Sequence, residues 1–231
     1  MFLLDPLYFV IVGPALLLSI IAQVSVKRTF QRFSRMATAS GLSGVQAAAQ
    51  ILRAHGVGGV RIERAGGFLS DHYDPRGRVL RLSPGVFAGR SVSAVGVAAH
   101  EAGHALQHAR GYFPLQVRSA LVPVSQIGSY LAWPLLLIGI LFGALSLVKI
   151  GVVFFGAAVL FQIVTLPVEF DASRRAVAVL GGQGILSGDE LQGTRKVLRA
   201  AALTYVAAAA AAVLQLVYFL LRAGLLGGGD D

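Results

Sequence analysis

Long stretches without a charged residue constrain this chain more than any other feature of its sequence. Residues 6–26, 119–148, 150–168 and 200–221 contain no Asp, Glu, Lys or Arg. Each stretch has about as many residues as the ~20 that cross the hydrocarbon core of a bilayer, or more. A chain of 231 residues is too short to cover four such helices with polar structure. We therefore expect four transmembrane helices, at about residues 7–26, 121–145, 151–167 and 201–221.

The four helices predict how the rest of the chain is divided. We expect the first transmembrane helix in residues 1–26, a cytoplasmic domain in 27–118 and a transmembrane hairpin of the second and third helices in 119–168. A second cytoplasmic segment follows in 169–200, then the fourth helix in 201–222 and a disordered tail in 223–231. This division puts 18 of the 20 Lys and Arg residues on one face, which the positive-inside rule identifies as cytoplasmic.

The first segment is expected to be an uncleaved anchor with its N-terminus outside. A cleaved signal peptide is the alternative, but it would begin with a basic region. Here the first residues, MFLLDP, include Asp5 and no Lys or Arg, and the basic residues Lys27 and Arg28 follow the apolar run.

The net charge of +9 is explained by this topology and predicts contact with anionic lipid headgroups, not with nucleic acid. The basic segments lack the interleaved aromatic residues of proteins that bind single strands. The absence of cysteine excludes disulfides, thiolate metal ligands and a cysteine nucleophile.

The predicted cytoplasmic segments contain short elements. An amphipathic helix is expected to end near Gly56, and short strands joined by turns follow, including the turn DPRG at residues 74–77. A helix is then expected from about Ser91 to Gly111. The sequence SLVKI at residues 146–150 predicts the tight loop of the hairpin, and GGQG at residues 181–184 predicts a break between two helices. The expected fold is therefore mainly α, with a small β element in the cytoplasmic region.

The sequence HEAGH at residues 100–104 matches the zinc-binding pattern H-E-x-x-H. Histidines four residues apart lie on one face of a helix, so both imidazoles can bind one zinc ion. Glu101 can then take a proton from a water molecule that the zinc activates for attack on a peptide carbonyl. Ala102 and Gly103 are small enough for a substrate or a neighbouring helix to approach closely.

A catalytic zinc site needs three protein ligands and one open position. His108 continues the four-residue series, but each such step turns by about 40° around a helix and rises by about 6 Å. We therefore expect His108 to lie behind the ligands or on the surface. Glu169 is the better third ligand, because the predicted hairpin crosses the membrane twice and returns the chain to the same face as His100 and His104.

The sequence resembles the YugP-type neutral zinc metallopeptidases of bacterial membranes over residues 41–199. The resemblance rests on DHYDPRGRVLRLSPGVF, HEAGHALQ, RSALVPVS and LPVEFDASRRA. The wider plan is similar to that of the HtpX-type and CAAX-prenyl endopeptidases, with a zinc helix, a hairpin and then a glutamate ligand. It implies a zincin-like (gluzincin) site at the cytoplasmic face of the inner membrane, with one zinc ion held by His100, His104 and Glu169 and with Glu101 as the catalytic base.

Two roles at the site stay open in the sequence. In the similar families an aspartate four residues after the ligand glutamate orients a histidine, but here that position is Ser173. Asp171 and Asp74 are the candidates for the orienting role. The candidate donors to an oxyanion are His72, Tyr73, Arg174 and Arg175. Each of these four also has a plainer interpretation, as a strand or turn residue or as a headgroup contact.

These features predict a membrane zinc endopeptidase that cuts membrane or membrane-proximal proteins. The alternative is a non-proteolytic membrane module with a structural metal or a partner-binding role. A transporter is disfavoured, because the apolar segments carry almost no ionisable residue. The expected partners are a protein or peptide substrate and the lipid bilayer, and a membrane-protein adaptor or an oligomer stays open.

Overall fold

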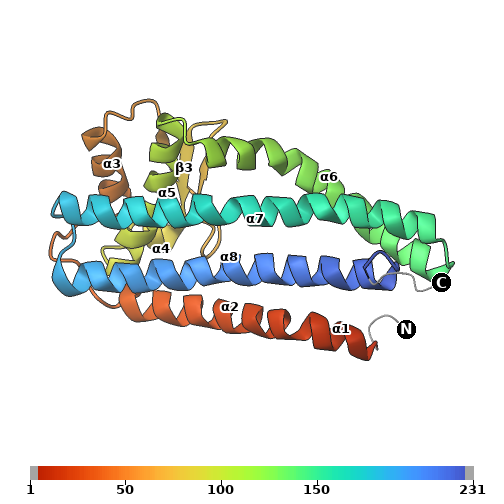
Figure 1. Cartoon of the computed structure of the whole chain (residues 1–231). Coiled ribbons are helices and arrows are strands. Elements are labelled where there is room, and N and C mark those ends of the chain that lie inside the picture. The colour runs from red at the N-terminus through yellow and green to blue at the C-terminus, as the bar shows by residue number, and fades with distance from the viewer. Residues whose placement is uncertain (1–4, 227–231) are drawn as a thin grey trace. The chain divides into compact units, whose positions relative to one another are not determined.

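The computed structural model describes residues 5–226 and is mainly helical, with one three-stranded sheet (Figure 1). The elements are α1 (Pro6–Ile11), α2 (Gly13–Ser34), α3 (Gly44–Ala54), β1 (Arg61–Arg64), β2 (His72–Asp74), β3 (Val79–Leu82), α4 (Pro84–Phe87), α5 (Val92–Ala109), α6 (Phe113–Leu141), α7 (Leu145–Gly182) and α8 (Gly188–Arg222). They form two compact units. The helix unit contains residues 1–22, 117–166 and 204–231, and the site unit contains residues 23–116 and 167–203.

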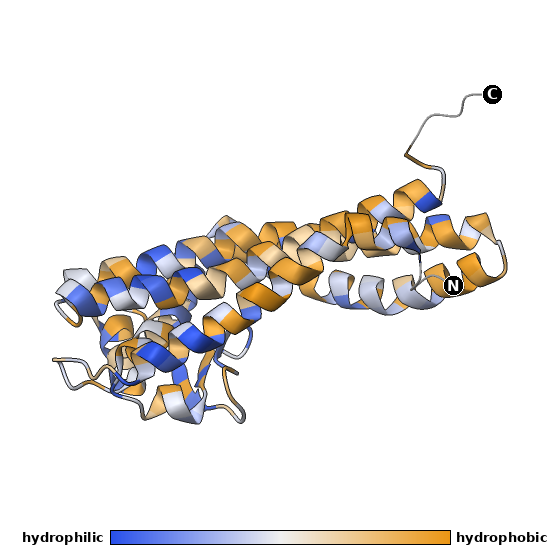
Figure 2. Ribbon diagram, turned by 90° about the horizontal axis from the view of Figure 1, so that it is seen from below, coloured by the Kyte–Doolittle hydropathy of each residue, from blue (hydrophilic) through white to orange (hydrophobic). Residues whose placement is uncertain are grey.

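Three helices among residues 5–226 are long and apolar enough to cross a membrane, namely α6, α7 and α8. Hydrophobic residues predominate along their segments in the helix unit (Figure 2). The first predicted span is not among the three. Its apolar run is divided between α1 and α2 at Val12, just before Pro14, and the last third of α2 carries Lys27, Arg28 and Arg32. A membrane-spanning role for this segment therefore stays a prediction.

The hairpin loop lies earlier than SLVKI. Helix α6 ends at Leu141 and α7 begins at Leu145, so the turn is formed by residues 142–144. Gly143 has a φ of +65°, a conformation that suits glycine and ends the helix, which is why the turn forms here and not at Lys149. Helix α7 then continues through Pro167 to the predicted break at GGQG, so the third membrane segment and the start of the second cytoplasmic segment are one helix.

The core of the helix unit is formed by apolar side chains from α6, α7 and α8, together with Val12. Aromatic rings meet edge to face there, with the ring centroids of Phe155 and Phe219 5.5 Å apart. Asp5, the N-cap of α1, accepts a 2.8 Å hydrogen bond from the hydroxyl of Tyr218, which ties α1 to α8. Of the tail predicted for 223–231, residues 227–231 lie outside the described part.

The site unit surrounds α5 with α3 and the sheet. Helix α3 begins with a capping box between Ser43 and Gln46, and it ends shortly before Gly56, as its sequence predicts. In the sheet, the central strand β3 pairs parallel with β1 and antiparallel with β2. Asp71 fixes the sheet's end, because its carboxylate accepts hydrogen bonds from the backbone N–H and the hydroxyl of Ser83, at 2.7 and 3.0 Å.

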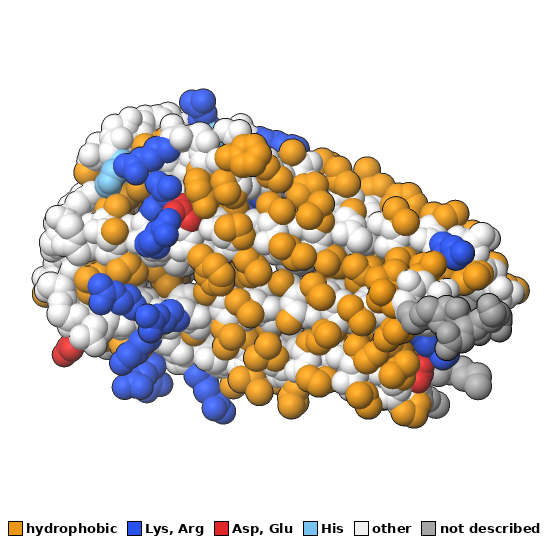
Figure 3. Space-filling view, viewed as in Figure 1, with side chains coloured by type: hydrophobic (Ala, Val, Ile, Leu, Met, Phe, Trp, Pro, Cys, Tyr) orange, Lys and Arg blue, Asp and Glu red, His pale blue; other side chains and the backbone are white. Residues whose placement is uncertain are grey.

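Charge is distributed unevenly over the surface. Figure 3 shows Lys and Arg side chains gathered over the site unit, whereas the visible face of the helix unit is largely hydrophobic. The helix unit has few charged residues because residues 119–148, 150–168 and 200–221 contain none. This pattern fits a chain whose apolar segments lie in lipid.

Candidate metal centre

Helix α5 carries the two histidines of the HEAGH sequence. The helix begins after Ser91, whose side chain accepts a hydrogen bond from the N–H of Ala94, and it is buried along most of its length. The rings of His100 and His104 lie with their centroids 4.7 Å apart. His104 is buried and His100 is slightly more exposed, so the pair faces the interior of the site unit.

Glu169 reaches this histidine pair from α7. Its Oε2 lies 3.1 Å from Nε2 of His100 and 3.6 Å from Nε2 of His104. The three potential ligand atoms all lie within 4.8 Å of one another, so one metal ion could be held among them. Glu169 lies beyond the charge-free stretch 150–168 and is only 2% exposed. Burial opposes its ionisation, but hydrogen bonds from the two imidazoles outweigh burial and hold the pKa of Glu169 well below its usual range.

Gln107 orients the ring of His104 through the ring nitrogen that does not face Glu169. The Nδ1 of His104 lies 3.0 Å from Oε1 of Gln107, which is fully buried. The Nε2 of Gln107 donates to the carbonyl of Val168 and to Oδ2 of Asp171, at 2.8 and 2.9 Å. Because the amide nitrogen serves two acceptors, the amide oxygen is left to accept from the ring N–H of His104. The Nε2 of His104 is thereby held on the side of the ring that faces Glu169.

Asp171 is therefore connected to His104 through the Gln107 amide and not by direct contact. Its carboxylate also accepts hydrogen bonds from Arg174 and Arg175. Burial opposes ionisation of Asp171, but Arg175, Gln107 and Arg174 outweigh it and lower its pKa. The ionised carboxylate is thus the fixed end of a chain of hydrogen bonds that holds the ring of His104.

His100 is oriented by a different residue. The hydroxyl of Ser173 lies 3.1 Å from Nδ1 of His100, so each histidine has its Nδ1 in a hydrogen bond and its Nε2 near Glu169. Ser173 occupies the position at which the resemblance implied an aspartate. The neutral hydroxyl makes the same contact, with less charge than a carboxylate would bring.

The other candidates from the sequence have hydrogen-bond partners elsewhere. Asp74 accepts from the backbone N–H groups of Arg76 and Gly77 at 3.0 and 3.1 Å, which closes the predicted DPRG turn. The exposed His72 lies with Nδ1 2.8 Å from the carbonyl of Ser70. Asp74 thus closes a turn, and a position for His72 over the metal cluster is not supported by its contacts.

Tyr73 and His108 bind each other. The hydroxyl of Tyr73 lies 2.8 Å from Nδ1 of His108, and burial raises the pKa of Tyr73. His108 is not part of the metal cluster, which agrees with the helix geometry. Arg174 and Arg175 contact Asp171, so the described contacts assign none of the four candidate oxyanion donors to that role.

The donor set fits a catalytic zinc ion. Two imidazole nitrogens and one carboxylate oxygen form one of the three-ligand sets that leave a fourth position open. Both histidines have the second-nitrogen hydrogen bonds that metal-binding imidazoles require. The cluster is therefore arranged to receive a divalent ion that prefers nitrogen and oxygen ligands.

Comparison with known proteins identifies the chain's family. A family model described as "Putative neutral zinc metallopeptidase" matches residues 8–224, which is nearly the whole chain. The chain belongs to this family. Among its relatives in the zinc metallopeptidase family is the "Putative membrane protease YugP" of Bacillus subtilis (strain 168), which is 46% identical over 217 residues, covering 94% of this chain and 96% of the relative. No solved structure matches the chain.

Membership of the zinc metallopeptidase family confirms the resemblance read from the sequence motifs. The family name implies zinc and a protein substrate, and His100, His104 and Glu169 form a group that could hold the metal. Sequence reasoning missed Gln107 as a partner of His104. A usable signal was present, because Gln107 follows His104 by three residues and therefore lies beside it on the helix.

Proposed function

We propose that the chain is a zinc endopeptidase of the gluzincin type that hydrolyses peptide bonds of membrane or membrane-proximal proteins. The observation that carries the proposal is the meeting of His100, His104 and Glu169, whose ligand atoms lie within 4.8 Å of one another. These residues are the proposed ligands of one zinc ion. Membership of a zinc metallopeptidase family supports the same reaction class.

Different residues of the chain have different proposed roles in peptide hydrolysis. Zinc held by the three ligands would supply the Lewis acidity that activates water and polarises the substrate carbonyl. Glu101 is buried beside His100 on α5 and is the proposed base. It takes a proton from the attacking water as the new C–O bond forms. It then gives the proton to the leaving amine as the peptide C–N bond breaks.

We propose four transmembrane helices with the N-terminus outside and the metal centre at the cytoplasmic face of the bacterial inner membrane. Support comes from the three apolar helices α6, α7 and α8 and from the membrane protease name of the Bacillus relative. The distribution of Lys and Arg, with 18 of 20 on the side of residues 27–118 and 169–199, supports the orientation.

The experiment compares wild type with Glu101→Gln in metal content and in cleavage of an unstructured protein. Glu101→Gln is expected to keep zinc and to lose proteolysis. Glu63→Gln is the matched control, because Glu63 lies in β1 in ion pairs with Arg61 and Arg81, and it should keep both. Proteolysis that survives in Glu101→Gln would exclude Glu101 as the base. A wild-type protein that holds zinc and cuts nothing would favour a structural metal.

A further inference from the structure

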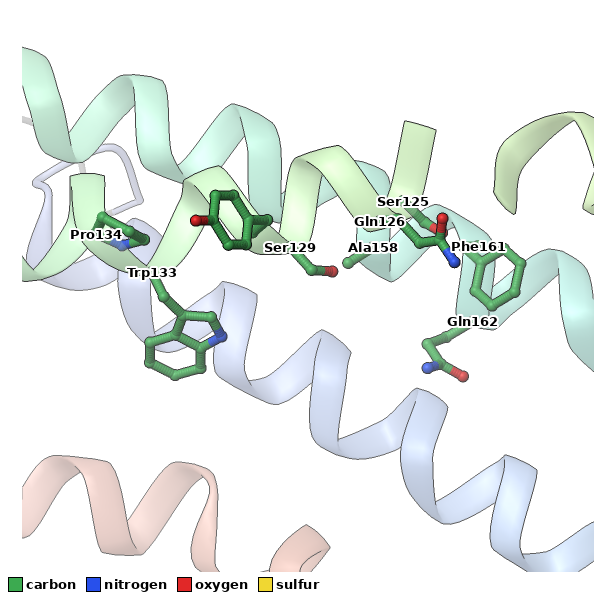
Figure 4. Close-up of a pocket in the computed structure, with 9 residues that line it drawn as sticks. Ser125, Gln126, Ser129, Trp133, Pro134, Ala158, Phe161 and Gln162 are labelled. Atoms are coloured by element: carbon green, nitrogen blue, oxygen red, sulfur yellow. The ribbon is translucent and has the colours of Figure 1, made fainter. Parts of the chain in front are cut away.

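A groove runs along the helix unit between α6 and α7. Its volume is about 710 Å³, and it lies within the predicted membrane segments. Figure 4 shows its lining residues projecting from the two helices. The groove is lined by Ser125, Gln126, Ser129, Tyr130, Trp133, Pro134, Ala158, Phe161 and Gln162.

Two carboxamides in this groove have no hydrogen-bond partner within the described part of the chain. Gln126 is exposed and Gln162 is half-buried, and neither side chain forms a hydrogen bond with another residue of the described range 5–226. Both lie in stretches without any charged residue. An amide without a hydrogen-bond partner costs several kcal/mol in hydrocarbon, so polar residues at such depth usually serve a pathway or a ligand.

Pro134 interrupts the backbone hydrogen bonding of α6 beside the groove. Pro134 lies inside α6 and has no N–H, so the carbonyl of Tyr130 loses the donor that position 134 would normally provide. Tyr130 and Pro134 both line the groove. The groove therefore offers amide donors and acceptors beside an interrupted turn of α6, and Trp133 and Phe161 provide aromatic lining.

This combination suits a peptide segment more than a lipid. An acyl chain has no hydrogen-bonding group, and a phospholipid headgroup remains at the interface and provides few donors. A transmembrane segment with a polar side chain or with small residues exposes both donors and acceptors at this depth.

We propose that the groove between α6 and α7 binds a transmembrane segment of a protein substrate, with the carboxamides of Gln126 and Gln162 as its hydrogen-bonding groups. The proposal rests on the proposed peptidase function, for which it names the substrate class. Substrates whose membrane segment carries a central polar or small residue are selected over uniformly apolar ones.

Disulfide cross-linking tests the binding directly, because the chain contains no cysteine of its own. The probe is a synthetic peptide with one span of about 20 residues, a central Asn-Gly pair and one cysteine beside it. It is reconstituted in phosphatidylcholine and phosphatidylglycerol vesicles with Gln126→Cys or Gln162→Cys, each in a Glu101→Gln background. Both variants should cross-link, whereas a peptide with Leu-Leu at its centre should react several-fold less.

Adjacent exposed residues provide matched controls. Ile127 and Ile163 are 59% and 47% exposed and do not line the groove, so Ile127→Cys and Ile163→Cys should react weakly with the same peptide. Equal reaction at all four positions would overturn the proposal, as would equal reaction with the Leu-Leu peptide. Cross-links between two copies of the chain in place of the peptide would assign the groove to self-association.

Cleavage separates this proposal from the peptidase function. The double variant Gln126→Leu/Gln162→Leu should cut a membrane-embedded substrate with the Asn-Gly centre about five- to tenfold more slowly. The reason is that it loses two hydrogen bonds to the substrate at membrane depth. It should cut an unstructured soluble protein at the wild-type rate. Equal slowing of both substrates, or of neither, would overturn groove binding. Failure of wild type to cut either one would overturn the peptidase function and leave the cross-linking result standing.

Discussion

A Cβ atom added to Gly103 would lie 2.8 Å from the carbonyl oxygen of Ala172, so α5 and α7 meet at backbone contact beside the candidate metal centre. Gly103 directly precedes His104, and Ala172 directly precedes Ser173, the partner of His100. The sequence predicted close approach at this small residue, and the neighbour is a helix. The absence of a side chain at position 103 thus sets the distance between the histidines and Glu169.

The contact between Gly103 and Ala172 can be tested by substitution. Gly103→Ala should force the two helices apart, because the clash is with backbone and not with a flexible side chain. The cost is about 1–3 kcal/mol, and the displaced ligands should bind zinc more weakly. Zinc affinity is measured by competition with a chelator. Gly156→Ala is the control, since nothing lies within 4 Å of its added Cβ, and a comparable loss of affinity there would contradict the explanation.

Glu169 is expected to be essential for metal binding. Glu169→Ala removes the only carboxylate in the cluster of three ligand residues and leaves two imidazoles. The purified variant should therefore lose bound zinc in elemental analysis while retaining its helical circular dichroism. Glu190→Ala is a suitable control, because this half-buried glutamate lies in the first turn of α8. Unchanged zinc content in Glu169→Ala would remove Glu169 as a ligand.

The Gln107 amide is expected to increase zinc affinity without contacting zinc. Gln107→Leu keeps the side-chain volume but removes the hydrogen bond to His104, so the affinity should fall about 10- to 100-fold. Asp171→Asn should have a smaller effect in the same direction. The two effects should be non-additive in the double variant, because both residues act through one chain of hydrogen bonds. The exposed Gln192 offers the control Gln192→Leu, and additive losses would show that the two residues act independently.

Asp71 is expected to stabilise the site unit. Asp71→Ala leaves the buried N–H of Ser83 without its acceptor, which costs about 1–3 kcal/mol and lowers the Tm. Asp71→Asn retains an acceptor and should lower the Tm less. Burial raises the pKa of Asp71 above 3.8, so wild type should lose part of its stability as the pH rises from below 3.8 through the folded-state pKa. Asp71→Asn should lack that part of the decline.

The membrane topology can be tested with single cysteines. If the chain crosses the membrane four times, the cysteine of Lys149→Cys faces outward and the cysteine of Gly58→Cys faces the cytoplasm. A membrane-impermeant maleimide applied to intact cells should label only the first of these variants, and both after lysis. Labelling of both in intact cells, or of Gly58→Cys alone, would contradict the orientation. A further variant at Asp5, which should label from outside, tests the first span by itself.

The sequence predicted what depends on local pattern and on chain topology. Charge-free runs predicted the apolar helices α6, α7 and α8. Helical spacing predicted that His100 and His104 share one face of a helix and that His108 lies outside the metal site. Glu169 was reached by argument from a returning hairpin and not from any local motif. Gln107 was missed, because the orientation of its amide depends on acceptors that α7 brings from more than 60 residues away. The turn at residues 142–144 was misplaced, since Gly143 ended α6 before the charged Lys149 was reached.

The residues of the candidate metal cluster are synthesised at different times. A ribosome completes His100 and His104 well before it reaches Glu169, and the two long apolar helices α6 and α7 account for most of the chain between them. A nascent chain that ends before residue 169 contains the two imidazoles of the cluster without its carboxylate. The candidate metal-binding group is therefore complete only after α6, and α7 as far as Glu169, have been synthesised.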